Sequence, residues 1–228
     1  AIAITDHGNL YGAIEFYSAA KEAGIKPIIG VEGYVASGSH TVRDPNDRFP
    51  YHLTILARNE TGYRNLLQLV SRSYLDGFYY RPRMDRELLE MHSEGLIVLS
   101  GCPSGEMAKM ITSDRMDEAR EVAEWYRGVF GDHYYFELMS HDGVEQLPQI
   151  NSSLIELSGE TGIPLVATND SHYVYREDQP LQDLLLCIQT NSTVDDPKRM
   201  KFDGDSFYIK SEAEMAALWP DNPEAIAN

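Results

Sequence analysis

Residues 1–35, AIAITDHGNLYGAIEFYSAAKEAGIKPIIGVEGYV, decide the fold, because the spacing of apolar residues changes twice within them. Residues 1–5 form a short apolar run, residues 11–24 repeat apolar side chains at helical spacing, and residues 26–35 form a second apolar run. A strand, a helix and a strand in this order are typical of a parallel crossover unit. The stretch therefore predicts an α/β fold.

The rest of the chain continues this alternation. Further strand-like runs occupy residues 52–58, 95–100, 134–139 and 163–169, and helix-like stretches occupy residues 61–77, 113–131 and 147–162. Four predicted helices end at a glycine, namely Gly24, Gly77, Gly131 and Gly162. A glycine there is typical of a left-handed C-cap. We expect mostly parallel strands, because helical crossovers return the chain to the same edge of a sheet or barrel. Residues 36–51 are rich in turn formers and predict a long exposed loop.

Composition limits the class of protein. The 228 residues are 43% hydrophobic, which is enough for one sizeable core. No run reaches the roughly 20 apolar residues of a membrane helix, and the first residues lack a secretory signal. We therefore expect a cytoplasmic protein with no membrane partner. Cys102 and Cys187 follow unlike segments, which predicts two reduced thiols and no disulfide.

The charge of the chain restricts its partners further. There are 19 basic and 36 acidic residues, and the formal net charge is -17. Such a chain repels a polyanion at long range, which excludes a general nucleic-acid coat protein. Bound divalent cations can reverse the sign of the charge locally. Any action on phosphate esters therefore requires metals.

Polar residues with metal-binding chemistry gather just after the predicted strands or interrupt them. They are Asp6, His7, Glu32, Cys102, His141, Asp170 and His172. In a parallel barrel or doubly wound sheet the strand ends face one side, where loops assemble active sites. His52 differs, because it stands at the start of its strand. It joins the others only if that strand runs backwards or if its side chain points inward from within the strand.

Imidazoles, carboxylates and one thiolate are the donors that hold Zn, Mn or Fe with positions left open for water. Glu32 interrupts an apolar strand, so its carboxylate must be paired or metal-bound if it is buried. Asp170 and His172 are two residues apart, and in an extended chain both would point to one side.

Each of these residues also has a common structural use. A lone histidine after a strand is more often a hydrogen-bonded loop residue than a ligand. Cys102 alone reads as a small buried hydrophobe. Asp6 can cap the helix that begins near Leu10, and Asp170 can close a turn. These structural uses do not readily explain why so many residues with metal-binding chemistry occur together after the predicted strands.

Five separate blocks of the sequence resemble one known family. They are residues 3–36, 51–71, 77–85, 95–106 and 165–174, and they include TDHG, GVEGY, SGCPSGE and ATNDSHYV. In this order they resemble the PHP (polymerase and histidinol phosphatase) domain of bacterial DNA polymerase III alpha subunits. The resemblance runs along the whole chain and implies a distorted (β/α)7 TIM-like barrel that holds up to three divalent metals.

The resemblance also implies where the domain lies in a longer protein. Family domains begin with a strand that carries a His-x-His motif, and this sequence begins after that motif. We therefore expect a fragment truncated at both ends, with the first barrel strand missing. Residues 1–200 correspond to the PHP domain. Residues 201–228 resemble the start of the connection into the polymerase (palm) portion, and Ser211 with Glu214 predicts a capped short helix there.

The resemblance implies specific roles for the candidate residues. Six of the nine family ligand positions are matched, by His7, Glu32, His52, Cys102, Asp170 and His172. Asp170 and His172 are the expected catalytic pair. Asp6 is carried over as a residue that orients His7, as metal-bound imidazoles commonly require, and His141 is expected near the site without being a ligand. The metals are Zn, Mn or Fe, with Mg for the polymerase part of the parent.

The expected substrate is DNA. The family implies a 3′–5′ exonuclease acting on a primer-template, with a separate proofreading exonuclease subunit and a sliding clamp as partners of the parent replicase. Arg81 and Arg83 are candidates for a phosphate clamp, and Tyr79 or Tyr80 for stacking a terminal base. The alternative for this segment is an exposed loop with arginines lying along the surface and a packed aromatic.

Two other functions remain open from the sequence. The domain can be a non-catalytic scaffold that stabilises the polymerase and docks a separate exonuclease subunit. A scaffold has no reason to keep Cys102, Asp170 and His172 in its loops, so the sequence favours an active site. A free-standing PHP phosphatase would end near the barrel, and residues 195–228 argue against it.

Overall fold

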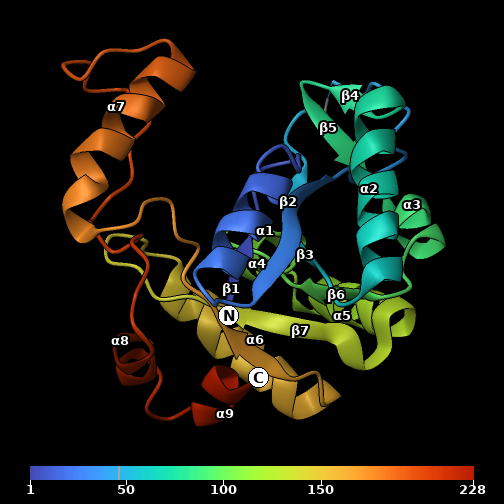
Figure 1. Ribbon diagram of the computed structural model, residues 1–228. Coiled ribbons are helices and arrows are strands. Elements are labelled where there is room, and N and C mark those ends of the chain that lie inside the picture. Colours follow the sequence, from blue (N-terminus) through green and yellow to red (C-terminus); the bar gives the residue numbers. More distant parts are fainter. Residues whose placement is uncertain (46) are drawn as a thin grey trace.

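The computed structural model of the protein describes residues 1–45 and 47–228. Figure 1 shows a curled sheet with helices packed around it. The strands are β1 (Ile2–Ile4), β2 (Pro27–Val35), β3 (Tyr51–Ala57), β4 (Phe78–Tyr79), β5 (Arg81–Met84), β6 (Leu96–Leu99), β7 (Tyr134–Leu138) and β8 (Leu165–Ala167). The helices are α1 (Ala13–Glu22), α2 (Glu60–Leu75), α3 (Arg86–Met91), α4 (Glu106–Thr112), α5 (Met116–Phe130), α6 (Leu147–Thr161), α7 (Gln179–Thr190), α8 (Glu212–Leu218) and α9 (Pro223–Ala227). The predicted α/β class is confirmed.

The strand order is β4-β5-β2-β3-β6-β7-β8, with β1 paired to β2. The sheet is mixed, and the expectation of mostly parallel strands is only partly met. Strand β3 is antiparallel to both of its neighbours, β2 and β6, whereas the β1/β2, β2/β5, β6/β7 and β7/β8 pairs are parallel. The described residues between β2 and β3 contain no crossover helix, so nothing carries the chain back to run parallel, and β3 returns in the opposite direction.

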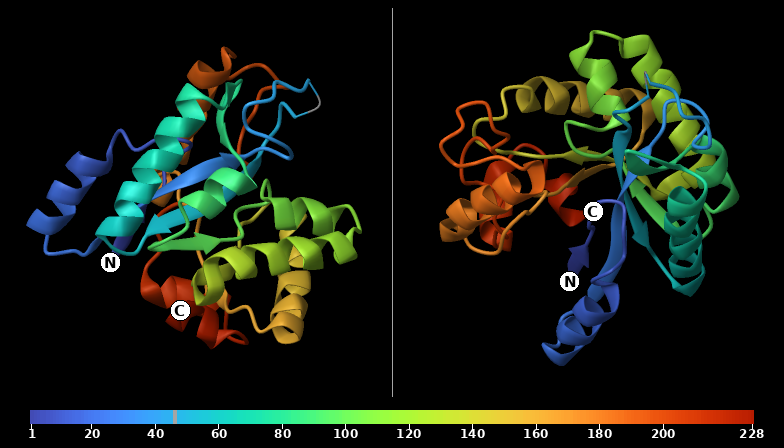
Figure 2. Two further views of the ribbon diagram at one scale, coloured as in Figure 1. Left: turned by 90° about the vertical axis from the view of Figure 1, so that its right-hand side faces the viewer. Right: turned by 90° about the horizontal axis from the view of Figure 1, so that it is seen from above.

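Helices cover the outer face of this sheet and enclose the main hydrophobic core. In the view from above in Figure 2 the helices lie around the strands. Along β3, Leu53 and Ile55 are buried in the core with residues of α2, α4, α5 and α6. Because side chains alternate along a strand, His52 and Thr54 face the other side of the sheet. The concave face is therefore left for polar residues.

The glycines that were expected to cap helices serve different purposes. Gly162 has the predicted left-handed conformation and Gly24 also has a positive φ of 71°. Gly131 has φ 58° but ψ −131°, outside the left-handed helical region. Gly77 does not have a positive φ, so a left-handed cap was the wrong explanation for it. A Cβ atom there would lie 2.0 Å from the carbonyl oxygen of Arg83, so close backbone packing requires the glycine.

The last residues of the chain pack onto the same core. Ser211 and Glu214 form the predicted capping box at the start of α8. Trp219 and Ala225 join the main hydrophobic core, and α9 contacts β8. Helix α7 projects away from the sheet (Figure 1).

Both cysteines are buried free thiols, as predicted. In the parts of the chain that the structure describes, no helix combines the length and apolar character needed to cross a membrane.

Candidate metal centre

The candidate ligands meet on the concave face of the sheet, beginning with His7 and Glu32. The backbone N–H of Gly8 donates to the carbonyl of Glu32 at 2.9 Å, and the N–H of Glu32 donates to the carbonyl of Asp6 at 3.1 Å. These two bonds hold the loop after β1 against β2. They bring Nδ1 of His7 to 3.4 Å from Oε2 of Glu32.

His52 lies beside His7 and Glu32 because β3 is antiparallel to β2. This is one of the two conditions under which the sequence placed His52 with the other candidate ligands. It pairs with Tyr34 of β2 across the antiparallel ladder. Its Nδ1 lies 2.6 Å from Oε1 of Glu32. The donor atoms of His7, Glu32 and His52 all lie within 4.8 Å of one another, which makes these three a possible metal site.

Cys102 adds a sulfur donor to this group. Its Sγ lies 3.4 Å from Oε1 of Glu32 and 3.4 Å from Nδ1 of His52. The preceding Gly101 has φ 87°, and a Cβ atom there would lie 2.6 Å from the carbonyl oxygen of His52. The glycine therefore allows the cysteine loop to approach β3 closely.

Asp170 and His172 complete the set on the opposite side. The rings of His7 and His172 are 6.3 Å apart, and Nδ1 of His172 lies 3.9 Å from Oδ1 of Asp170. The two residues are close, but the reason given for it from the sequence is wrong. Asp170 has φ 43°, a left-handed conformation that is costly for a residue other than glycine, so this segment is not extended. Backbone strain of this kind clusters at functional sites.

Hydrogen bonding prepares the imidazoles to act as ligands. Nδ1 of His172 lies 2.7 Å from the carbonyl oxygen of Asp170, so an N–H there donates to the carbonyl and leaves Nε2 with its lone pair. Burial lowers the pKa of His7 despite the opposing charge of Glu32. A neutral imidazole is the form that binds a metal.

Glu32, Asp170 and Cys102 bring three groups that can carry a negative charge close together. Burial, together with Glu32 and Asp170, raises the pKa of the Cys102 thiol well above its ordinary value. Burial and the charge of Glu32 raise the pKa of Asp170 to about 6, although His172 opposes the rise. A divalent cation would relieve this repulsion and favour the thiolate. The donor set therefore fits the metals that the family resemblance implies.

Glu137 of β7 is a polar residue of this face that the sequence analysis missed. Its side chain is buried, and its Oε2 accepts hydrogen bonds from Gly101 N–H at 3.0 Å and from the Thr54 hydroxyl at 3.1 Å. Its Oε1 accepts from the Thr168 hydroxyl at 2.7 Å. Each donor lies within two residues of a candidate ligand. The signal was present, since Glu137 interrupts an apolar strand as Glu32 does.

Asp6 and His141 lie beside the centre. A cavity of about 520 Å³ is lined by five of the candidate ligands, and exposed Asp6 lines it as well. Among the described residues no hydrogen bond joins the Asp6 carboxylate to His7, which contacts Glu32 instead. The expectation that Asp6 orients His7 therefore has no contact to support it. His141 is stacked on Phe207 with ring centroids 3.9 Å apart, and burial lowers its pKa to about 4. Phe207 also packs against His172, so His141 is near the centre but separated from it by this ring.

The two arginines expected to clamp phosphate have different environments. Arg83 is 0% exposed, pairs with Asp47 at 2.9 Å and donates to the backbone carbonyls of Gly77, His40 and Val42. It is a structural residue and is not available to DNA. Arg81 is exposed, with its guanidinium 5.8 Å from the Tyr34 ring centroid.

The two tyrosines of this segment are adjacent in the sequence but differ in how much of each ring is exposed. Tyr80 is 61% exposed, with φ 59°, whereas Tyr79 is partly buried under the guanidinium of Arg83, 5.1 Å from its ring centroid. Of the two, Tyr80 has the more exposed ring, whose centroid lies 4.7 Å from that of Tyr79 in an edge-on arrangement.

Comparison with known protein families agrees with the architecture and the site. Residues 1–141, more than half of the chain, match the family described as PHP domain. The chain therefore belongs to the PHP domain family, and its curled sheet is consistent with the TIM-like barrel of that family.

Individual relatives narrow the resemblance to one class of PHP protein. DNA polymerase III subunit alpha of Borreliella burgdorferi is 49% identical over 229 residues, which cover 100% of this chain and 20% of the relative. The subunit of the same name from Treponema pallidum is 48% identical over 231 residues, with 100% and 20% covered. That of Thermus aquaticus is 46% identical over 224 residues, with 97% and 18% covered. The chain thus spans about a fifth of the length of these relatives.

Proposed function

We propose that this chain is the metal-dependent phosphodiesterase domain of a replicative DNA polymerase III alpha subunit, and that it removes nucleotides from the 3′ end of DNA. One observation carries the proposal. Imidazole, carboxylate and thiol donors from separate strands meet around Glu32, with His52 at 2.6 Å and His7 and Cys102 each at 3.4 Å. A scaffold would gain nothing from burying the Glu32 carboxylate and the Cys102 thiol beside these imidazoles, which costs stability.

Six residues would hold the metals, and they are His7, Glu32, His52, Cys102, Asp170 and His172. Divalent cations bound there would stabilise charge on the phosphoryl group and supply a water that attacks at neutral pH. Glu32 accepts a hydrogen bond from His52 and so fixes the orientation of that ring. Asp170 and His172 would act together there, because Nδ1 of the imidazole lies 3.9 Å from Oδ1 of the carboxylate.

The whole protein that this function implies is longer than the chain. We propose that residues 1–200 form the phosphodiesterase domain and that residues 201–228 begin the connection to a Mg-dependent polymerase portion. Its substrate would be a primer-template, and its partners a sliding clamp and a separate proofreading exonuclease subunit in the cytoplasm. The identity to alpha subunits along the chain supports this placement.

The test compares metal content and hydrolysis of a 3′-mismatched primer in the complete subunit and in this chain. Asp170→Ala and His172→Ala should each lose bound metal and cleavage together. His92→Ala, at the C-terminus of α3 and outside the ligand set, is the matched control and should change neither. If the Asp170 and His172 variants keep full cleavage, the proposed function is wrong. A metal-free complete subunit that still binds a separate exonuclease would favour the scaffold instead.

A further inference from the structure

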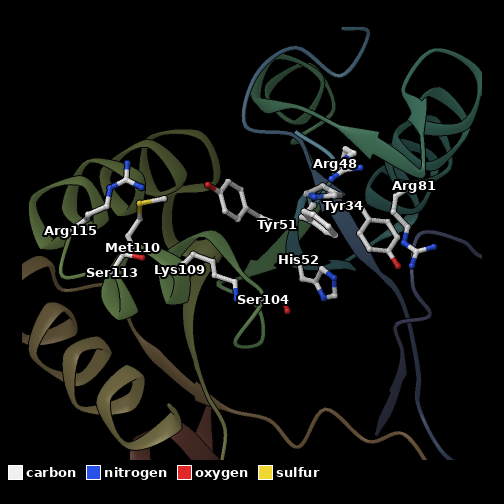
Figure 3. Close-up of a pocket in the computed structure, with 12 residues that line it drawn as sticks. Tyr34, Arg48, Tyr51, His52, Arg81, Ser104, Lys109, Met110, Ser113 and Arg115 are labelled. Atoms are coloured by element: carbon white, nitrogen blue, oxygen red, sulfur yellow. The ribbon is translucent and has the colours of Figure 1, made fainter. Parts of the chain in front are cut away.

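A second cavity of about 610 Å³ adjoins the metal centre, and we call it the basic groove. Figure 3 shows its labelled side chains, with Lys109 and Met110 of α4 facing Arg48, Tyr34 and Arg81 across the opening. Its lining includes four cationic side chains, Arg48, Arg81, Lys109 and Arg115, and among the described residues that line it there is no Asp or Glu. The chain as a whole has 36 acidic and 19 basic residues, so basic residues are strongly enriched in the groove relative to the whole chain.

Three of these cations are available to a ligand. Among the described residues, no carboxylate lies within ion-pair distance of Arg48, Arg81 or Lys109, and all three side chains are exposed. Arg115 differs, because it pairs with Glu118. The groove therefore presents a positive surface on a strongly negative protein, which is the electrostatic requirement for a polyanionic ligand.

Aromatic rings lie among these cations. Tyr34, Phe49 and Tyr51 all line the groove. Phe49 is 85% exposed, and the guanidinium of Arg48 lies 5.7 Å from its ring centroid. Aromatic rings between cations along a groove are the pattern with which proteins bind single-stranded nucleic acid, whose unpaired bases stack on the rings.

The groove lies next to the metal centre, and His52 and Tyr34 of its lining contact the candidate ligands. His52 lines the groove and also contacts Glu32 at 2.6 Å. The ring of Tyr34 lies 5.2 Å from that of His52 and 6.0 Å from that of His7. A strand lying in the groove would therefore meet the candidate ligands at its end.

We propose that the basic groove binds the single-stranded 3′-terminal segment of a nucleic acid and directs its end to the metal centre. Arg48, Arg81 and Lys109 contact the phosphates, and Phe49 stacks on a base. The contacts are with the backbone and the ring faces, so binding is independent of sequence. The path from groove to cleavage rests on the proposed function, whereas binding in the groove does not require metal.

The experiment measures the anisotropy of a fluorescein-labelled short oligothymidylate with the full chain, in excess chelator, over a series of salt concentrations. Arg48→Glu and Lys109→Glu should each weaken binding about tenfold or more at low salt and flatten the salt dependence by about 0.7 in log–log slope. Phe49→Ala should weaken binding about tenfold without changing the slope. Lys21→Glu is the matched control, because both lysines are exposed in the last turn of a short helix. It should bind as the wild type does.

Two results would overturn the proposal. One is equal affinity of Arg48→Glu, Lys109→Glu and Lys21→Glu. The other is competition by a blunt duplex as effective as that by the unlabelled single strand, which would indicate unspecific attraction. Metal-dependent cleavage by the wild type is measured in parallel. Cleavage with no effect of the groove variants on binding refutes the groove alone, and groove-dependent binding without any cleavage refutes the proposed function alone.

Discussion

Replacing Glu137 by glutamine should remove a pH dependence from the stability of the protein. Burial first, and then the charges of Asp170 and Glu32, raise the pKa of Glu137 from 4.5 to about 7, against the opposing hydrogen bonds of Thr168 and Thr54. A carboxyl group whose pKa is higher in the folded protein binds its proton more tightly there. Its contribution to stability is therefore complete below about pH 4.5 and is lost as the pH rises through about 7.

The size of this effect follows from the difference between the two pKa values. That difference is about 2.5 pH units, and at about 1.36 kcal/mol per unit the ionised group lowers the free energy of unfolding by about 3 kcal/mol. Glutamine has nearly the same shape and does not titrate. It also loses one acceptor for the donors Gly101, Thr54 and Thr168, but that loss changes little with pH.

The assay is urea unfolding at pH 5 and pH 8 in excess chelator. Between these values the wild type should lose about 2 to 3 kcal/mol relative to Glu137→Gln. Glu156→Gln, on the exposed side of α6, is the control and should follow the wild type. If wild type and Glu137→Gln change in parallel with pH, the reasoning about the buried carboxyl is refuted.

The remaining stability predictions concern buried packing and charge. Arg83→Ala leaves the buried Asp47 carboxylate without its cationic partner, and should lower the free energy of unfolding by about 3 to 5 kcal/mol. Arg81→Ala, at an exposed position two residues away, should change it by less than about 0.5 kcal/mol. Similar unfolding midpoints for the two variants would contradict the structural role of Arg83. Gly62→Ala places a Cβ atom 1.8 Å from the carbonyl oxygen of Gly95, so α2 must shift. The free energy of unfolding, measured by chemical denaturation, should fall by about 3 kcal/mol. A fall below about 0.5 kcal/mol would mean that α2 and the loop before β6 are less closely packed.

The sequence predicts the class of fold because periodicity is a local property. The change of spacing in residues 1–35 does indicate β1, α1 and β2 in the right order. The direction of β3 is not local. It depends on what connects β2 to β3, where the described residues contain no crossover helix, and residues 36–51 were predicted to be a loop without this consequence being drawn. His52 could therefore be placed in the site only conditionally.

In the candidate site, the sequence indicates which residue types can act as ligands, but it does not show which side chains become buried or paired. Glu32 was recognised because a carboxylate in an apolar strand must be paired, and it lies between His7 and His52. The same rule applied to Glu137 would have found it. Arg81 and Arg83 are indistinguishable in sequence, because residues two apart lie on the same face of a strand. What separates them is pairing, since Arg83 lies opposite Tyr34 of β2 whereas Arg81 pairs with Tyr79 of β4.

The central claim is that Cys102 and its neighbours form a metal centre, and titration of the chain with Co²⁺ tests it most directly. Cobalt bound by a thiolate gives an intense charge-transfer absorption in the near ultraviolet that oxygen and nitrogen ligands do not give. The account predicts that this band appears in the wild type, disappears in Cys102→Ser and persists in Cys187→Ser, whose thiol is also buried but lies in α7, outside the centre. A wild type without the band, or a Cys102→Ser variant that keeps it, would contradict the account.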